Sequence, residues 1–231
     1  MKLSAKAALL CGITVELIVF VFFYSIGERP LTALSSTEAA ARPLVLLDAG
    51  HGGEDGGACG EDGTLEKDVN VAVTNALGEL LTFCGCRVSY TRTDDRSIGQ
   101  GDTVRERKVS DMHARLTLYD AADLVVSVHQ NKFGSASCRG AQFFYGAVSP
   151  ESRVLAETMR TQFVTLLQPD NTRELKPGGD NVFLLYKTTS PAVLAECGFL
   201  SNPDELRHLK SDDYQRSVAF ALAAGVLQYL S

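Results

Sequence analysis

Two histidines and two glutamates of this 231-residue chain have residue types and surroundings that could form a hydrolytic metal site. His51 stands in a glycine-rich run, His129 ends an apolar run, Glu66 begins an amphipathic stretch, and Glu196 is enclosed by apolar residues. Two imidazoles and one carboxylate are a common ligand set for catalytic zinc, and they leave a fourth position for water. A second carboxylate outside that set can act as a general base.

Each of these residues also has an ordinary interpretation when it is taken alone. His51 would be a turn histidine, His129 a core histidine, and Glu66 a first-turn glutamate favoured by the helix dipole. Glu196 is harder to explain, because an unpaired buried carboxylate costs several kcal/mol and needs a partner or a raised pKa. Taken together, the four favour a zinc ion (Zn2+) held by His51, Glu66 and His129, with Glu196 as the general base.

The glycines around His51 need an explanation of their own. Five glycines lie between positions 50 and 57, which indicates a backbone held tightly for some purpose. Phosphate binding is the main alternative to a metal site. The glycines fit neither the dinucleotide-binding nor the P-loop pattern, and no lysine follows at the P-loop position. Nucleic acid is not an expected partner, since the formal net charge is −6 and nucleic-acid binders need a basic face.

Apolar runs and amphipathic stretches alternate along the chain and would place these residues at strand ends. We predict strands at 43–50, 87–93, 123–131, 141–146, 182–186 and 192–200, and helices at 65–85, 103–120, 149–167 and 212–230. Apolar strands that alternate with helices indicate an α/β fold, a single three-layer domain with a mostly parallel central sheet flanked by helices. In such sheets, ligands bind beyond the carboxyl ends of the strands.

The N-terminus predicts membrane attachment or export. Two lysines precede an apolar run of about 20 residues, which is long enough to span a bilayer. Because both lysines come first, the positive-inside tendency puts the rest of the chain outside the cytoplasm. We expect a signal anchor at 1–26, with a cleaved signal peptide as the alternative. A linker at 27–42 and a catalytic domain at 43–231 would follow.

The six cysteines show no zinc-finger spacing and no C-x-x-C pair. We expect most of them to be small buried hydrophobic residues. One disulfide stays open for a domain outside the cytoplasm, but the spacing assigns no pairing.

Four motifs in order resemble the zinc-dependent N-acetylmuramoyl-L-alanine amidases (amidase type 3): DAGHGGEDGG at 48–57, a Glu-Lys pair at 66–67, SVHQN at 127–131 and AECGFLSNPDE at 195–205. The resemblance runs from about Leu44 to Tyr229. It implies cleavage of the amide between N-acetylmuramic acid and the L-alanine of the peptidoglycan stem peptide. It also implies zinc ligands at His51, Glu66 and His129. Glu196 falls on the position of the catalytic glutamate.

Within this family, SVHQNKF, GAQFFYG and the short anchor-bearing N-terminus are most similar to the spore-cortex germination amidases. These act in making the muramic-δ-lactam of the cortex, so the resemblance implies work at the outer face of the cell membrane, in the cell wall or in the spore cortex. Some family members carry an inserted helix over the zinc. Only about ten residues separate Asn131 from Ala141, so we expect no such lid. Control would come from expression, localisation or an accessory regulatory protein.

The remaining polar candidates have weaker support. We assign them to solvated surfaces, with contact to substrate carboxylates as the alternative for the cations Arg105, Arg107, Arg115, Arg173 and Lys176. His113 and His208 stand in polar, helix-like surroundings, and we expect both at the surface.

Two other functions stay open. The chain could be another zinc-dependent cell-wall peptidase or deacetylase, which analysis of the products would distinguish. It could also be a catalytically inactive peptidoglycan-binding domain. The intact Glu196 opposes that second alternative, because a binding module has no need of a buried base.

Overall fold

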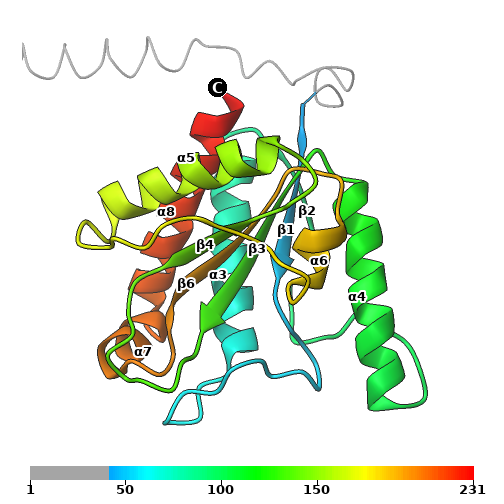
Figure 1. Cartoon of the computed structure of the whole chain (residues 1–231), viewed down its shortest axis with the longest axis horizontal. Coiled ribbons are helices and arrows are strands. Elements are labelled where there is room, and N and C mark those ends of the chain that lie inside the picture. The colour runs from blue at the N-terminus through cyan, green and yellow to red at the C-terminus, as the bar shows by residue number, and fades with distance from the viewer. Residues whose placement is uncertain (1–41) are drawn as a thin grey trace, which may run out of the picture. The chain divides into compact units, whose positions relative to one another are not determined.

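The computed structural model of the chain describes residues 42–231 (Figure 1). In this part of the chain, six strands form one sheet in the order β2-β1-β3-β6-β4-β5. Their bounds are β1 Leu44–Ala49, β2 Arg87–Tyr90, β3 Leu124–Asn131, β4 Gln142–Tyr145, β5 Lys176–Pro177 and β6 Ala192–Phe199. Strands β2, β1, β3 and β6 are parallel, whereas β4 runs antiparallel to β6 and carries β5 parallel to itself. The predicted mostly parallel sheet is confirmed.

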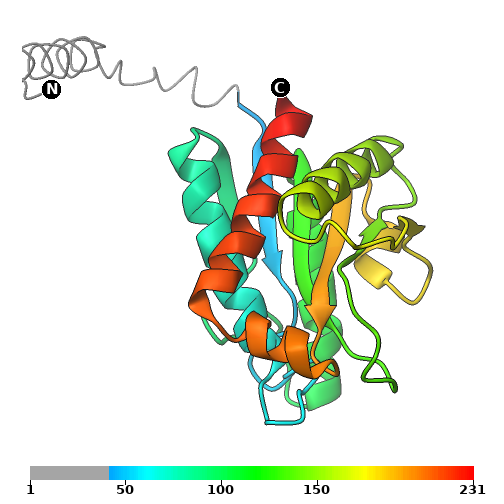
Figure 2. The ribbon, with the colours of Figure 1, turned by 90° about the vertical axis from the view of Figure 1, so that its left-hand side faces the viewer.

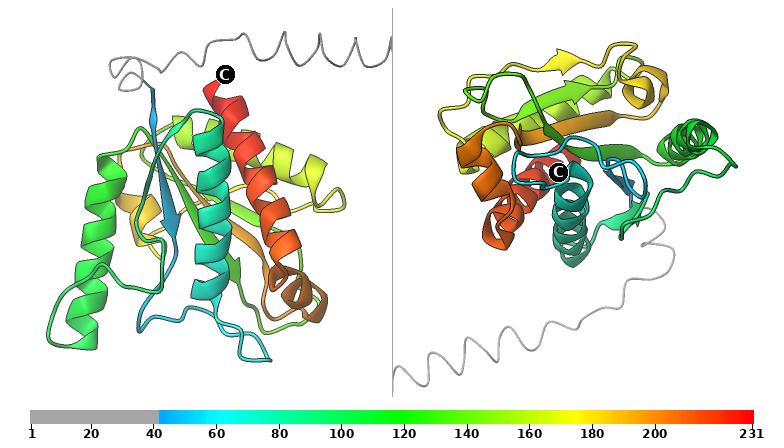
Figure 3. Two further views of the ribbon diagram at one scale, coloured as in Figure 1. Left: turned by 180° about the vertical axis from the view of Figure 1, so that it is seen from behind. Right: turned by 90° about the horizontal axis from the view of Figure 1, so that it is seen from below.

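Helices cover both faces of this sheet within residues 42–231. Their bounds are α3 Glu66–Phe83, α4 Val104–Asp120, α5 Glu151–Leu166, α6 Phe183–Lys187, α7 Pro203–Leu209 and α8 Asp212–Leu230. Side chains of α3, α5 and α8 join the core on one face, and those of α4 and α6 join the core on the other. The turned views show α3 and α8 side by side against the sheet (Figures 2 and 3). The expected single α/β domain with three layers is confirmed.

Helix α3 shows how apolar spacing positions a polar residue. Its side chains at four-residue steps are all buried against the sheet: Val69, Val73, Leu77 and Leu81. Full burial of each such side chain stabilises the fold by roughly 1.5–3 kcal/mol. This stripe therefore fixes the axis of α3 and, with it, the place of Glu66, the first residue of the helix.

The connections of the sheet reverse direction between β1 and β3. The chain leaves β1, crosses one face of the sheet as α3 and returns as β2; it then crosses the other face as α4 and returns as β3 on the opposite side of β1. Such a reversal is where open α/β sheets bind ligands, outside the carboxyl ends of the strands. In Figure 1 the arrows of β1 and β3 point down towards the loop that follows β1.

The strand predicted at 182–186 is wrong. These residues fall on the short helix α6, whose Leu184 and Leu185 are buried in the same core as α4. A run of five apolar residues has no periodicity that separates a strand from a buried helical turn. The outer strand is instead β5, which we did not predict. It is only two exposed residues long and pairs with Phe144 and Tyr145 of β4.

The predicted N-terminal anchor at 1–26 lies outside the described residues, as does the linker at 27–42 apart from its last residue. Within 42–231, no helix is long and apolar enough to cross a bilayer. Residues 132–141, between β3 and β4, contain no helix, which agrees with the expected absence of an inserted lid.

Candidate metal centre

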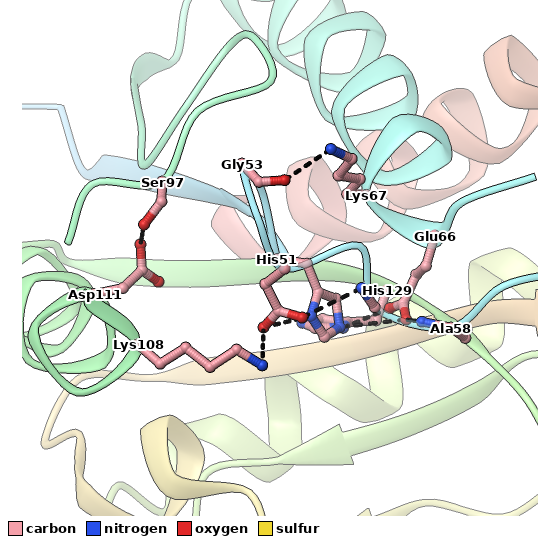
Figure 4. A network of polar contacts seen from close by, with 12 residues as sticks. His51, Gly53, Ala58, Glu66, Lys67, Ser97, Lys108, Asp111 and His129 are labelled. Carbon is pink, nitrogen blue, oxygen red and sulfur yellow. Dashed lines mark hydrogen bonds and ion pairs between the residues drawn. The ribbon is translucent and has the colours of Figure 1, made fainter. Parts of the chain in front are cut away.

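The structure gathers three of the four candidate residues at the carboxyl ends of β1 and β3 (Figure 4). Metal-binding atoms of His51, Glu66 and His129 all lie within 4.8 Å of one another. The distance is 3.2 Å from His51 Nε2 to Glu66 Oε2 and 2.8 Å from His129 Nδ1 to Glu66 Oε1. The two imidazole rings meet edge to face with centroids 5.0 Å apart. Residues far apart in the sequence thus form one compact donor set.

Glu66 is the buried anion at the middle of this set. Burial acts to raise the pKa of its carboxyl, but the hydrogen bonds and charges of His129 and His51 outweigh burial. The net effect puts the pKa far below its ordinary range, so Glu66 is a carboxylate. Three N–H groups also donate to it: Ala58 N at 2.7 Å, Gln130 N at 3.1 Å and Asn70 Nδ2 at 3.3 Å.

The ionisation of His129 follows from this anion. Burial alone would lower its pKa, but the hydrogen bond and charge of Glu66 raise it, with further help from the charge of Glu196. Without a metal, the ring of His129 therefore keeps its proton and its positive charge more readily than a free imidazole does. A divalent cation would supply that charge directly, and neutral imidazole with carboxylate is a donor set that zinc accepts. The residues present thus fit a zinc ion.

Glu196 lies beside the cluster and outside it. It pairs in register with His129 of β3 and with Gln142 of β4. Its Oε2 is buried, and no hydrogen-bond partner for it is found among residues 42–231. Burial raises the pKa of Glu196 to about 7, against the opposing charge of His129. A buried carboxyl oxygen without a partner is costly, so it is available to a bound molecule.

The glycines of the loop allow close approach to the cluster. A Cβ on Gly50 would lie 2.2 Å from the ring of His129, and one on Gly57 would lie 2.5 Å from Glu66 Oε2. His51 itself has φ 63°, a left-handed conformation that no other non-glycine residue in 42–231 adopts. The glycine-rich run is therefore explained by the packing of the cluster, and this favours the metal interpretation over phosphate binding.

Arg115, which we expected on a solvated helix face, is 2% exposed, so that prediction is wrong. Its guanidinium forms an ion pair with Asp48 at the end of β1 and another, 2.6 Å long, with Asp111. It also donates to the backbone oxygen of His51 at 2.7 Å. Burial acts to raise the pKa of Asp48, but Arg115 and two hydroxyl donors hold it well below its usual range. Arg115 thus connects α4 to the strand and loop that carry His51.

A second buried arginine, Arg92, was not identified from the sequence. It is 1% exposed and donates to backbone oxygens of Ala49, Gly50, His51 and Lys67 at 2.8–3.0 Å. These acceptors lie at the start of the glycine loop and in the first turn of α3. Arg92 thus holds together the two segments that carry His51 and Glu66. Nothing in the surrounding sequence distinguishes it from an exposed arginine.

The other sequence candidates lie apart from the cluster. Arg107 pairs with Glu54 at 2.8 Å, and Arg173 lies over the ring of Phe199, 4.7 Å from its centroid. The surface positions expected for the exposed residues Arg105, Lys176, His113 and His208 are confirmed. The five cysteines in residues 42–231 are free, and of them only Cys197 is fully buried. Most therefore differ from the buried positions that we expected.

Comparison with known proteins gives the family context. The family model described as N-acetylmuramoyl-L-alanine amidase matches residues 45–228. The germination-specific N-acetylmuramoyl-L-alanine amidase of Bacillus subtilis is 32% identical, over 93% of this chain and 91% of the relative. The CwlD amidase of Clostridioides difficile, solved in complex with the GerS lipoprotein, is 36% identical with a TM-score of 0.78, over 82% of this chain and 98% of that one. An N-acetylmuramoyl-L-alanine amidase from Clostridium difficile 630 is 28% identical with a TM-score of 0.71, over 82% and 97%.

Proposed function

The chain belongs to the N-acetylmuramoyl-L-alanine amidase family, and we propose that it cleaves the bond between N-acetylmuramic acid and L-alanine with a zinc ion held by His51, Glu66 and His129. The protein is a hydrolase of peptidoglycan. What we propose is the identity of its metal ion, the residues that bind it and the residue that acts as the base. The observation that carries the proposal is the clustered donor set, within 4.8 Å, next to a carboxyl oxygen of Glu196 that has no hydrogen-bond partner among residues 42–231.

Each residue then has a defined task. His51, Glu66 and His129 hold the zinc ion, which supplies Lewis acidity that lowers the pKa of water and polarises a carbonyl. Glu196 in its ionised form takes a proton from the attacking water and passes it to the nitrogen of the leaving L-alanine. In the metal-free site burial raises the pKa of Glu196 to about 7, so this side chain can both accept and release a proton near neutral pH. Arg92 and Arg115 hold the backbone that carries His51.

The identity of the cleaved bond is tested by digesting purified peptidoglycan and identifying the products by mass spectrometry. We expect intact stem peptides with a free L-alanine amino group, and glycan with free lactyl carboxyl groups. A chelator should stop their release, and added zinc should restore it. Shortened stem peptides or deacetylated sugars would instead support a different zinc hydrolase, and no products at all would support an inactive binding domain.

We further propose that the protein acts outside the cytoplasm, on spore-cortex peptidoglycan. The support is its similarity to the germination-specific Bacillus subtilis amidase and to the CwlD amidase. Because that CwlD was solved with a lipoprotein, we propose an accessory protein as a partner of this chain too. Deletion of the gene should remove muramic-δ-lactam from the cortex of the spores. Cortex with its normal muramic-δ-lactam content would contradict this role.

A further inference from the structure

The imidazole of His51 has a carboxylate at each of its two ring nitrogens. Nε2 is 3.2 Å from Oε2 of Glu66, a member of the proposed zinc set. Nδ1 is 3.3 Å from Oδ2 of Asp55, which is not a member of that set. A histidine that binds a metal through one nitrogen commonly donates the N–H of the other to a carboxylate, which fixes its tautomer and orientation.

The fold holds Asp55 in this place by several contacts. Gly52 and Asp55 exchange two backbone hydrogen bonds, 2.9 and 3.1 Å long, and the resulting turn returns Asp55 to His51. The backbone N–H of Gly57 donates to Asp55 Oδ1 at 3.3 Å, so both carboxylate oxygens are engaged. From α4, Lys108 Nζ comes within 3.4 Å of Oδ2, and Figure 4 shows this side chain extended towards the cluster.

From this geometry we propose that Asp55 is a positioning residue of the metal centre, which accepts the Nδ1–H of His51 and so directs the lone pair of Nε2 towards the zinc position beside Glu66. The inference rests on the proposed function. Asp55 is outside the donor set, and Lys108 keeps its carboxylate in place from the neighbouring helix. The side chain of Asp55 is 38% exposed, so its ion pairs add little to the stability of the fold. Its contribution should therefore appear in metal binding.

The test compares zinc affinity in three variants with that of the unsubstituted protein, by competition with a chromophoric chelator. We expect Asp55→Asn to weaken zinc binding by roughly 10- to 100-fold. Asp55→Glu keeps the carboxylate and should recover part of that loss. The matched control is Glu54→Gln. This change removes an ion pair, 2.8 Å long, between the same loop and Arg107 of α4, the helix that carries Lys108. It should leave zinc affinity unchanged.

Thermal unfolding of the metal-free proteins separates positioning from folding. Without zinc, we expect Asp55→Asn and the unsubstituted protein to unfold at the same temperature. On adding zinc, the unfolding temperature of Asp55→Asn should rise less. Unchanged zinc affinity in Asp55→Asn would overturn the inference, as would an equal loss in Glu54→Gln. If the unsubstituted protein binds zinc and hydrolyses peptidoglycan in that case, the proposed function stands. If the unsubstituted protein binds no zinc, both the inference about Asp55 and the proposed function fail.

Discussion

Glu66 lies between two imidazoles, so the ionisation of the cluster and its affinity for metal are linked. A zinc ion held as proposed would need His129 as the neutral ring, whereas Glu66 raises the pKa of that ring against the effect of burial. The proton therefore persists on His129 to a higher pH than on a free imidazole, whose pKa is about 6.5. A metal ion must displace it.

We accordingly predict that zinc affinity falls as pH falls through the raised pKa of His129. Dissociation constants at about pH 6 and about pH 8 check this, and binding should be tighter at the higher value. Calorimetry in buffers with different ionisation heats should detect protons released on binding. Equal affinities at both pH values, with no proton release, would contradict the linkage.

The absence of a side chain at Gly50 leaves room for the ring of His129 in the same cluster. In Gly50→Ala the new Cβ would lie 2.2 Å from the His129 ring, so the ring must move. We predict a large loss of both zinc binding and peptide release. Gly134→Ala is the matched control, because a Cβ there has nothing within 4 Å, and it should change neither property. Normal zinc binding by Gly50→Ala would show that the ring has more room than the structure gives it.

Residue types in the sequence indicate which side chains could carry the chemistry of the site. They do not indicate which side chains hold those residues in place. His51, Glu66 and His129, which the structure brings together, could be selected as candidates with Glu196 because possible metal ligands and buried bases belong to few residue types. Arg115 could not be assigned, since its partner Asp48 lies 67 positions away and an arginine in a charge-rich helix is ordinarily exposed. The pairing that buries it exists only after β1 and α4 have packed together.

Between elements, the buried contact of β1 with α4 makes the strongest prediction for stability. Arg115→Met leaves Asp48 as a buried anion with hydroxyl donors but without its arginine, which should lower the free energy of unfolding by about 3–5 kcal/mol. Urea unfolding of the metal-free protein measures this. Arg216→Met is the matched control, because its ion pair with Asp213, 3.2 Å long, is exposed, and we expect little change.

Acid should reveal the same pair in the unsubstituted protein. The folded pKa of Asp48 is depressed, so its contribution is complete above its unfolded pKa of about 3.9 and is lost as pH falls through the folded value. The difference in stability between the unsubstituted protein and Arg115→Met should shrink in that range. A difference that stayed constant down to about pH 2 would mean that Asp48 is not the partner that matters.

The elements themselves were predictable where periodicity was long. The stripe of α3 and the apolar runs of β1, β3 and β6 fall where they were expected. Helix α7 was missed, although Asn202 accepts from the backbone N–H groups of Asp204 and Glu205 and Pro203 follows the cap, a recognisable start signal. Helix α6 was misread as a strand because its burial depends on α4, which the local sequence does not show.

For the whole molecule, the order of strands explains why the site lies where it does. Parallel β1, β3 and β6 end at one edge, so residues at positions 51, 129 and 196 are brought close together. Glu66 joins them because α3 begins directly after the loop. The fold class therefore predicts the location of the site, and the residue types predict its chemistry. The substrate bond follows from membership of the family.

The central claim is that three residues hold zinc and a fourth acts as the base. Its most direct test measures zinc content and peptide release on the same preparations of the unsubstituted protein, His51→Ala and Glu196→Gln. We predict that Glu196→Gln keeps its zinc but loses roughly 100- to 10,000-fold in hydrolysis, whereas His51→Ala loses both. Near-normal peptide release by Glu196→Gln, with zinc bound, would contradict the account.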